Sequence, residues 1–169
     1  MIPKRVKQFY INVSDNMTVK DYEYVKEILN NKELELFLRL SKSEQKHSVR
    51  IAKDIESVIE NNNTNDEDII KNRDLLIRGA LLHDIGKSVK RLNVIDKSII
   101  VILNKLTDGQ LKSLKKSKKV QCYYNHSEYG YEILKDMVKE ELILDIIRNH
   151  HKNTSNKIVE FFKYIDDRN

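Results

Sequence analysis

Residues 66–84 read DEDIIKNRDLLIRGALLHD, and this stretch decides the fold class. Its apolar side chains recur at helical spacing and surround almost the whole helix, which is typical of a buried central helix. The apolar positions are Ile69, Ile70, Leu75, Leu76, Ile77, Ala80, Leu81 and Leu82. We expect Thr64 and Glu67 to form a Ser/Thr-x-x-acid capping box at its start, and Gly86 to stop it.

The rest of the chain also favours helices. Its 169 residues include four glycines and one proline, too few turn residues for an all-β protein of this size. Thr18 with Asp21, and Ser41 with Glu44, predict two further capping boxes. Helices are expected over 19–29, 42–60, 94–105, 127–138, 139–150 and 155–166. The sequence therefore predicts an all-α fold with a single domain.

Composition excludes several classes of protein. Hydrophobic residues make up 40% and charged residues 34%, which is typical of a folded soluble domain. The single cysteine, Cys122, excludes an internal disulfide and a zinc site built from several thiolates. The longest apolar run, 99–103, is too short to span a bilayer, and residues 1–10 lack the apolar core of a signal peptide. We expect a cytoplasmic protein without a membrane partner.

The charge is mildly basic, with 31 Lys and Arg against 26 Asp and Glu, a net charge of +5. This balance permits an anionic substrate without requiring one. No helix–turn–helix signature is present, so nucleic acid is not an expected partner. The lysine-rich segment 112–119 is interpreted as a solvated connector, with attraction of an anionic nucleotide as the alternative.

Residues 41–169 hold every candidate for chemistry, and residues 1–40 hold none. The apolar residues of 1–40 are spaced like packing positions. We interpret 1–40 as an N-terminal helical extension of the same domain. A homodimer contact through this extension is left open.

All five histidines lie where a binding site could use them. His47 shares an apolar helix face with Ile51, and His83 precedes Asp84 at the end of the apolar stretch. His126 stands just before an expected helix, and the remaining two, His150 and His151, end an apolar helix. A single such histidine is more often a core residue with one hydrogen-bond partner. The joint pattern, together with Asp166 on the last helix, predicts a metal centre.

The ligand types and their number say more about that centre. Imidazole and carboxylate suit iron, manganese, zinc or nickel better than calcium. Seven side chains exceed what one six-coordinate ion can accept while still holding water, so they predict two ions with Asp84 as a bridge. If one ion binds, the expected ligands are His47, His83, Asp84 and Asp166. The full set is His47, His83, Asp84, His126, His150, His151 and Asp166.

Five stretches carry a resemblance to a known family: 47–50 (HSVR), 81–87 (LLHDIGK), 126–134 (HSEYGYEIL), 146–151 (IIRNHH) and 165–169 (IDDRN). Together they resemble the HD superfamily of metal-dependent phosphohydrolases, in the HDIG form. The resemblance implies an all-helical fold with a metal site among its central helices.

The resemblance also implies roles for single residues. His47, His83, Asp84 and Asp166 correspond to the core metal ligands, with Asp167 as the alternative to Asp166. The additional His126, His150 and His151 resemble the subset with two metals, which includes cyclic-dinucleotide phosphodiesterases. That subset's cyclic-di-GMP members carry Gly-Tyr-Pro soon after the paired histidines, where this chain reads KNTSN at 152–156.

The expected function is hydrolysis of a phosphate ester of a nucleotide or related small molecule by metal-activated water. Asp84 and Lys87 are the expected catalytic residues, and Lys87 and Arg50 the expected substrate contacts, with a salt bridge as the alternative for Arg50. Iron or manganese is expected, with zinc, nickel or magnesium as alternatives. The competing functions are a phosphodiesterase for a signalling nucleotide and a catalytically silent metal- or nucleotide-binding module.

Overall fold

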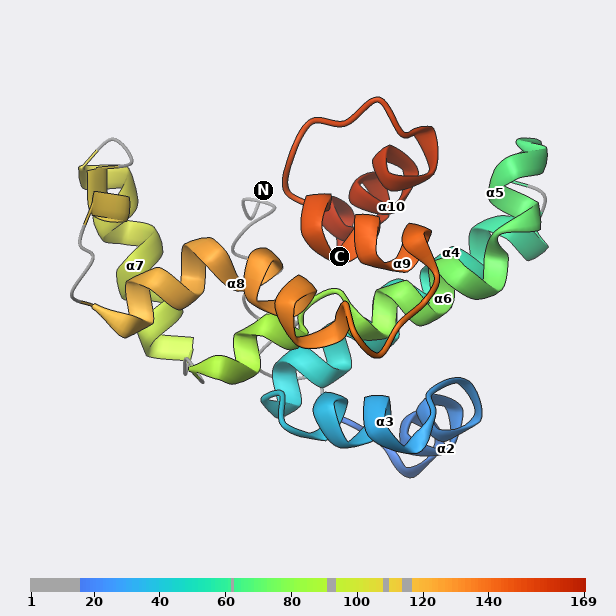
Figure 1. Ribbon diagram of the computed structural model, residues 1–169, viewed down its shortest axis with the longest axis horizontal. Coiled ribbons are helices and arrows are strands. Elements are labelled where there is room, and N and C mark those ends of the chain that lie inside the picture. The colour runs from blue at the N-terminus through green and yellow to red at the C-terminus, as the bar shows by residue number, and fades with distance from the viewer. Residues whose placement is uncertain (1–15, 62, 91–93, 108–109, 114–116) are drawn as a thin grey trace, which may run out of the picture.

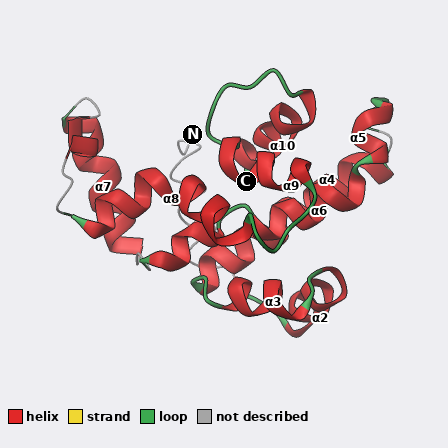
Figure 2. Cartoon of the chain, in the orientation of Figure 1, coloured by secondary structure: helices red, strands yellow, loops and turns green. Residues whose placement is uncertain are grey.

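The computed structural model describes residues 16–61, 63–90, 94–107, 110–113 and 117–169. Within these residues the chain is helical and forms no strand, which confirms the predicted all-α fold (Figure 2). The α-helices are α2 Val19–Ile28, α3 Asn31–Leu38, α4 Lys42–Glu60, α5 Glu67–Lys71, α6 Arg73–Leu82, α7 Val94–Leu106, α8 Lys118–Leu134, α9 Glu141–Asn149 and α10 Lys157–Arg168. Two 3-10 helices, η1 Ile85–Val89 and η2 Gln110–Ser113, lie between them.

Two of the predicted capping boxes are present. The side chain of Thr18 accepts a hydrogen bond from the backbone of Asp21 at the start of α2, and the carboxylate of Asp21 accepts one from the backbone of Thr18. Ser41 and Glu44 form the same pair at the start of α4. These reciprocal bonds satisfy backbone donors that a helix N-terminus leaves open, and they fix where both helices begin.

The predicted central helix is in fact two helices, α5 and α6, and Thr64 does not cap either. Asp66 caps α5 by accepting from the backbone N–H groups of Asp68 and Ile69, and Thr64 accepts from the backbone of Asp66. The break falls at Asn72, whose side-chain amide donates to the carbonyl of Asp68 at 2.8 Å. An asparagine that bonds the preceding turn competes with helix continuation.

The prediction that Gly86 stops the central helix is wrong, because α6 already ends at Leu82. Gly86 lies inside η1, where this short helix crosses α8. A Cβ atom on Gly86 would stand 1.8 Å from the carbonyl oxygen of His126 and 2.6 Å from the backbone nitrogen of Gly130. The glycine is therefore required for close approach of two backbones.

The start of α8 also differs from the prediction. The sequence places His126 just before a helix over 127–138, but α8 begins at Lys118 and holds His126 well inside it. Part of the lysine-rich segment, 114–116, lies outside the described residues. Lys119 at the start of α8 forms an ion pair with Asp96 of α7 at 2.6 Å.

The helices pack around α4 and α6, which run through the middle of the molecule (Figure 1). In this view α9 and α10 lie above them, α2 and α3 lie below, and α7 extends to one side with the outer part of α8. Val25, Leu29, Phe37 and Leu40 join the main core, so α2 and α3 share it with the later helices. Among the described residues no helix has the length and apolar character that crossing a membrane requires.

Candidate metal centre

The fold brings all seven predicted ligand side chains into one cluster, and they come from five parts of the chain. His47 lies on α4, and His126 lies on α8. His83 and His150 are the C-terminal caps of α6 and α9. The cluster is completed by Asp84 at the start of η1, His151 just after α9, and Asp166 on α10.

Asp84 lies between two groups of histidines. Its Oδ2 atom is 3.4 Å from the Nε2 atom of His83, and its Oδ1 atom is 3.5 Å from the Nε2 atom of His126. The two oxygens of this carboxylate therefore face different imidazoles. On the first side, the Nε2 atom of His47 is 3.1 Å from Oδ1 of Asp166.

The second side is formed by three histidines. The Nε2 atoms of His126 and His151 are 3.0 Å apart, and the rings of His150 and His151 have their centroids 4.0 Å apart. Three sets of side chains each have one ligand atom per residue within 4.8 Å of the others. They are His47–His83–Asp84, His83–His150–Asp166 and His126–His150–His151.

Backbone carbonyls orient three of the imidazoles. The Nδ1 atoms of His83 and His126 lie 2.8 Å from the carbonyl oxygens of Ala80 and Tyr123, and that of His150 lies 2.9 Å from the carbonyl of Ile147. A carbonyl can only accept, so each Nδ1 carries a proton, and in the neutral form of each ring Nε2 keeps the lone pair. Such a partner fixes the tautomer that a metal-binding histidine needs.

The cluster also contains buried polar atoms that the described residues leave without hydrogen bonds. These include Oδ1 of Asp84, Nε2 of His150 and Nδ1 of His47. Asp84 and His150 are fully buried. An unsatisfied buried acceptor is costly, and a cation supplies what Asp84 Oδ1 and His150 Nε2 lack. The residues present therefore fit a divalent metal.

Burial sets the charge state of most of these imidazoles. It lowers the pKa of His126 to about 4, with the nearby charge of Lys87 acting in the same direction. Burial also lowers the pKa values of His47, His150 and His151. Neutral imidazole is the form that binds metals, so these histidines are prepared for ligation near neutral pH.

The two carboxylates are ionised. Burial alone would raise the pKa of Asp84, but the charges of His83 and Lys87 hold it well below its usual range. Burial would likewise raise the pKa of Asp166, but its hydrogen bond with His47 lowers it. Burial alone would lower the pKa of His83, and the charge of Asp84 raises it instead. The centre thus holds two anionic carboxylates among mostly neutral imidazoles.

One side of the cluster is accessible. His151 is exposed, and the side chain of His47 keeps 19% of its surface exposed. The Nζ atom of Lys87 lies 2.5 Å from Oδ2 of Asp84, so this lysine is at the cluster. Arg50 lies half-buried on α4, about one helical turn after His47.

The structure distinguishes Asp166 from its neighbour Asp167. Asp166 points toward His47, and its side chain is 10% exposed, whereas Asp167 is an exposed residue of α10. Asp145 lies on α9, outside the ligand cluster. Its carboxylate accepts hydrogen bonds from the side-chain amides of Asn149 and Asn156.

Sequence reasoning missed the carbonyls that hold the imidazoles. Each of the three carbonyl groups belongs to the residue three positions before its histidine. For His83 and His150 the signal is in principle present, because both are expected at helix ends, where the last carbonyls lack helical partners. Phe162, whose ring centroid is 5.5 Å from that of His83, was also missed as the apolar backing of the cluster.

Comparison with known proteins gives one match. A family model described as the HD domain matches residues 45–167, a range that includes all seven side chains of the cluster. No curated protein and no solved structure matches the chain.

Proposed function

Because the chain belongs to the HD-domain family, whose fold is associated with metal-dependent phosphohydrolases, we propose that it hydrolyses a phosphate ester of a nucleotide or related small molecule. The observation that carries the proposal is the convergence of five histidines and two aspartates with their ligand atoms facing one another. Within that cluster, buried Oδ1 of Asp84 and Nε2 of His150 have no hydrogen-bond partner among the described residues.

The proposed centre holds two ions. His47, His83, Asp84 and Asp166 would hold one of them. His126, His150 and His151 would hold the other, with Asp84 contributing its second oxygen. The positions of Asp84 Oδ1 and Oδ2, each near a different histidine, support this bridging role. Nitrogen and oxygen donors without thiolates favour iron or manganese, with zinc, nickel or magnesium as alternatives.

Divalent ions held there would supply Lewis acidity, both to a water nucleophile and to the oxygens of the phosphoryl group. The protein's own part is to hold the ligands in place and to present positive charge. Asp84, kept ionised by His83 and Lys87, provides the anionic ligand at the centre. The ammonium group of Lys87 lies at the cluster, where it can contact a phosphoryl or leaving oxygen. Arg50 is proposed as a more distant substrate contact.

A phosphodiesterase for a signalling nucleotide is the second candidate. The complete second group, His126, His150 and His151, favours it, because a centre with two ions suits the in-line cleavage of a phosphodiester. The two candidates differ in their products. A phosphodiesterase leaves a phosphomonoester on its product, such as a linear dinucleotide, whereas a phosphomonoesterase releases inorganic phosphate.

Elemental analysis of the purified chain, with parallel assays on a generic phosphodiester and a generic phosphomonoester, tests the proposal. We expect about two equivalents of a divalent transition metal, as a two-metal centre requires. Asp166→Asn should lose metal and activity, whereas the exposed Asp167→Asn should retain both. A metal-replete wild-type chain without bound metal, or loss in Asp167→Asn with retention in Asp166→Asn, would contradict the assignment.

A further inference from the structure

We infer that Asp145 is a positioning residue that sets the direction of the paired histidines His150 and His151. This inference rests on the proposed metal centre. Asp145 lies on α9 and does not itself belong to the ligand cluster. It acts on the segment 149–156, which runs from the last residue of α9 to the N-cap of α10 and contains the two histidines.

The carboxylate of Asp145 accepts two hydrogen bonds, one at each end of this segment, and we call this pair of bonds the clamp. Its Oδ1 atom accepts a hydrogen bond from Nδ2 of Asn149 at 2.7 Å, and its Oδ2 atom accepts one from Nδ2 of Asn156 at 2.8 Å. Asn149 immediately precedes His150. Asn156 is the N-cap of α10 and accepts from the backbone of Ile158 at 3.0 Å. One carboxylate therefore joins the residue before the histidines to the start of the helix that carries Asp166.

Side chains of α10 hold the middle of the same segment. Glu160 accepts from the backbone N–H of Thr154 at 3.0 Å. Lys163 donates to the carbonyl of Lys152 at 3.2 Å and to the side chain of Asn153 at 3.1 Å. The backbone on the far side of His151 is thus tied to α10, and the near side is tied through Asp145.

The chemistry of the clamp requires an acceptor with two oxygens. Both partners present amide N–H groups, so an asparagine at position 145 would satisfy one of them and turn its own NH₂ group toward the other. The core contacts of α9 come from Ile143, Ile146 and Ile147, which are fully buried and do not depend on the clamp. Loss of the clamp should therefore release the connection that carries His151 while α9 stays packed.

An exchange of the two side chains tests the inference. Asp145→Asn removes one acceptor, and Asn149→Asp alone places two carboxylates face to face. The double variant Asp145→Asn with Asn149→Asp restores both hydrogen bonds. In it, the amide introduced at position 145 donates to the carboxylate introduced at position 149 and accepts from Asn156. The double variant also keeps the net charge of the wild-type chain.

The measurement is a Co²⁺ titration of each metal-free protein, followed by the visible absorption of the bound Co²⁺, with thermal unfolding of the metal-free chains beside it. We expect the wild-type chain to bind two Co²⁺. Asp145→Asn should weaken one of the two about 10–100-fold, the usual effect of removing a group that orients a metal ligand. The double variant should bind within about threefold of wild type. Glu132→Gln, which removes an exposed carboxylate paired with Lys135, is the control and should not change the titration.

The outcomes separate the two proposals. A wild-type chain that binds no Co²⁺ would overturn the metal centre and the role of Asp145 with it. Two Co²⁺ bound equally well by wild type and Asp145→Asn would overturn only the role of Asp145. The role of Asp145 would also be overturned if the double variant failed to restore Co²⁺ binding. It would be overturned as well if the affinities for both ions fell together in proportion to a lower melting temperature. Either of these last two results would mean that Asp145 only stabilises the fold.

Discussion

At the scale of single residues, the orientation and charge state of the clustered side chains suit a cation even in the metal-free protein. Three imidazoles are held through Nδ1 by carbonyls, and burial keeps four of the five mostly neutral. Without metal, this arrangement lowers the free energy of unfolding at low pH. The buried histidines resist protonation in the folded state, whereas the same side chains in the unfolded chain take up protons at their ordinary pKa.

The metal-free protein should lose stability as the pH falls from about 6.5 toward 4. Between these values the unfolded chain protonates His126, whose folded pKa is about 4, while the folded chain does not. The difference corresponds to about 3 kcal/mol of unfolding free energy for this residue alone. The lowered pKa values of His47, His150 and His151 add to the same trend. The raised pKa of His83 opposes it, since its contribution is complete below pH 6.5 and is lost as the pH rises through its folded pKa.

Urea denaturation between pH 4.5 and 8, with a chelator present, measures this dependence. His126→Gln should reduce the slope, because it removes the group with the large downward shift. Stability that is constant, or that increases toward pH 4.5, would contradict the prediction.

The clustering of the seven side chains could be predicted from the sequence, because their joint pattern and order resemble those of the HD superfamily. Their geometry could not. Which oxygen of Asp84 faces which imidazole depends on how η1 crosses α8, and the carbonyl partner of His126 lies inside a helix that starts earlier than the sequence suggested. Local patterns say which residue types are present, and only packing places them.

At the scale of elements, the crossing of η1 and α8 fixes the distance between Asp84 and His126. Gly86 and Gly130 meet at this crossing. The sequence alone suggested that Gly86 stops a helix. A glycine that follows an apolar helix looks the same in the sequence whether it ends the helix or allows two backbones to approach closely. The break at Asn72 was hidden for a similar reason, since the apolar pattern continues on both sides of it.

Gly86→Ala should separate the two elements and disrupt the centre. The added methyl group would stand 1.8 Å from the carbonyl oxygen of His126, a backbone atom that cannot move without shifting α8. We expect a loss of about 3 kcal/mol or more in unfolding free energy, at the upper end for overpacking, together with loss of bound metal.

Gly79→Ala is the matched control. Its methyl group would meet the terminal carbon of Ile146 at 3.0 Å, the end of a flexible side chain. The change should cost less than about 1 kcal/mol, because alanine is also the better helix former. Chemical denaturation and metal analysis of both variants measure these effects. Equal losses of stability and metal at the two positions would contradict the special requirement for glycine at position 86.

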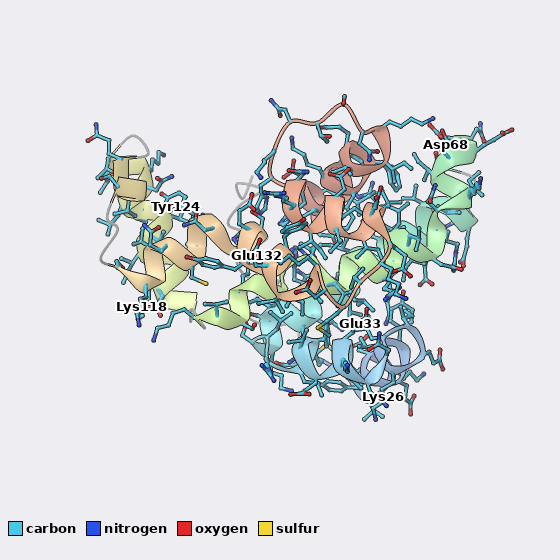
Figure 3. All side chains as sticks on the ribbon, in the orientation of Figure 1. Lys26, Glu33, Asp68, Lys118, Tyr124 and Glu132 are labelled. Atoms are coloured by element: carbon cyan, nitrogen blue, oxygen red, sulfur yellow. The ribbon has the colours of Figure 1, made fainter. Side chains whose placement is uncertain are left out.

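At the scale of the whole molecule, α2 and α3 are attached to the body that carries the centre. Besides the apolar contacts of the main core, Arg78 of α6 provides an ionic link. Its guanidinium contacts Glu33 of α3 at 2.5 Å and Glu140, before α9, at 2.8 Å. The side chain of Glu33 is 1% exposed, and Figure 3 shows Glu33 on the side of α3 nearest the centre of the molecule. We propose that residues 1–40 form an extension of the same domain for this reason.

Arg78→Met should destabilise the entire fold. It keeps an apolar stem of similar length but leaves the buried carboxylate of Glu33 without its cation, which costs about 3–5 kcal/mol. Arg39→Met removes a cation from an exposed pair with Glu35 on the same helix segment, so it should cost less than about 1 kcal/mol.

Thermal and urea unfolding followed by circular dichroism measure both. A single cooperative transition that shifts as a whole in Arg78→Met would indicate that α2 and α3 unfold together with the rest. Separate loss of a small helical fraction would show instead that the extension is an independent unit.

The contact between His47 and Asp166 joins residues 119 positions apart. During synthesis at about 5–20 residues per second, roughly 6–24 s pass between the addition of His47 and the addition of Asp166. Over that interval α4 and α6 can form and present His47, His83 and Asp84 while α10 does not yet exist. The proposed set of metal ligands is therefore incomplete until almost all of the matched residues 45–167 have been synthesised.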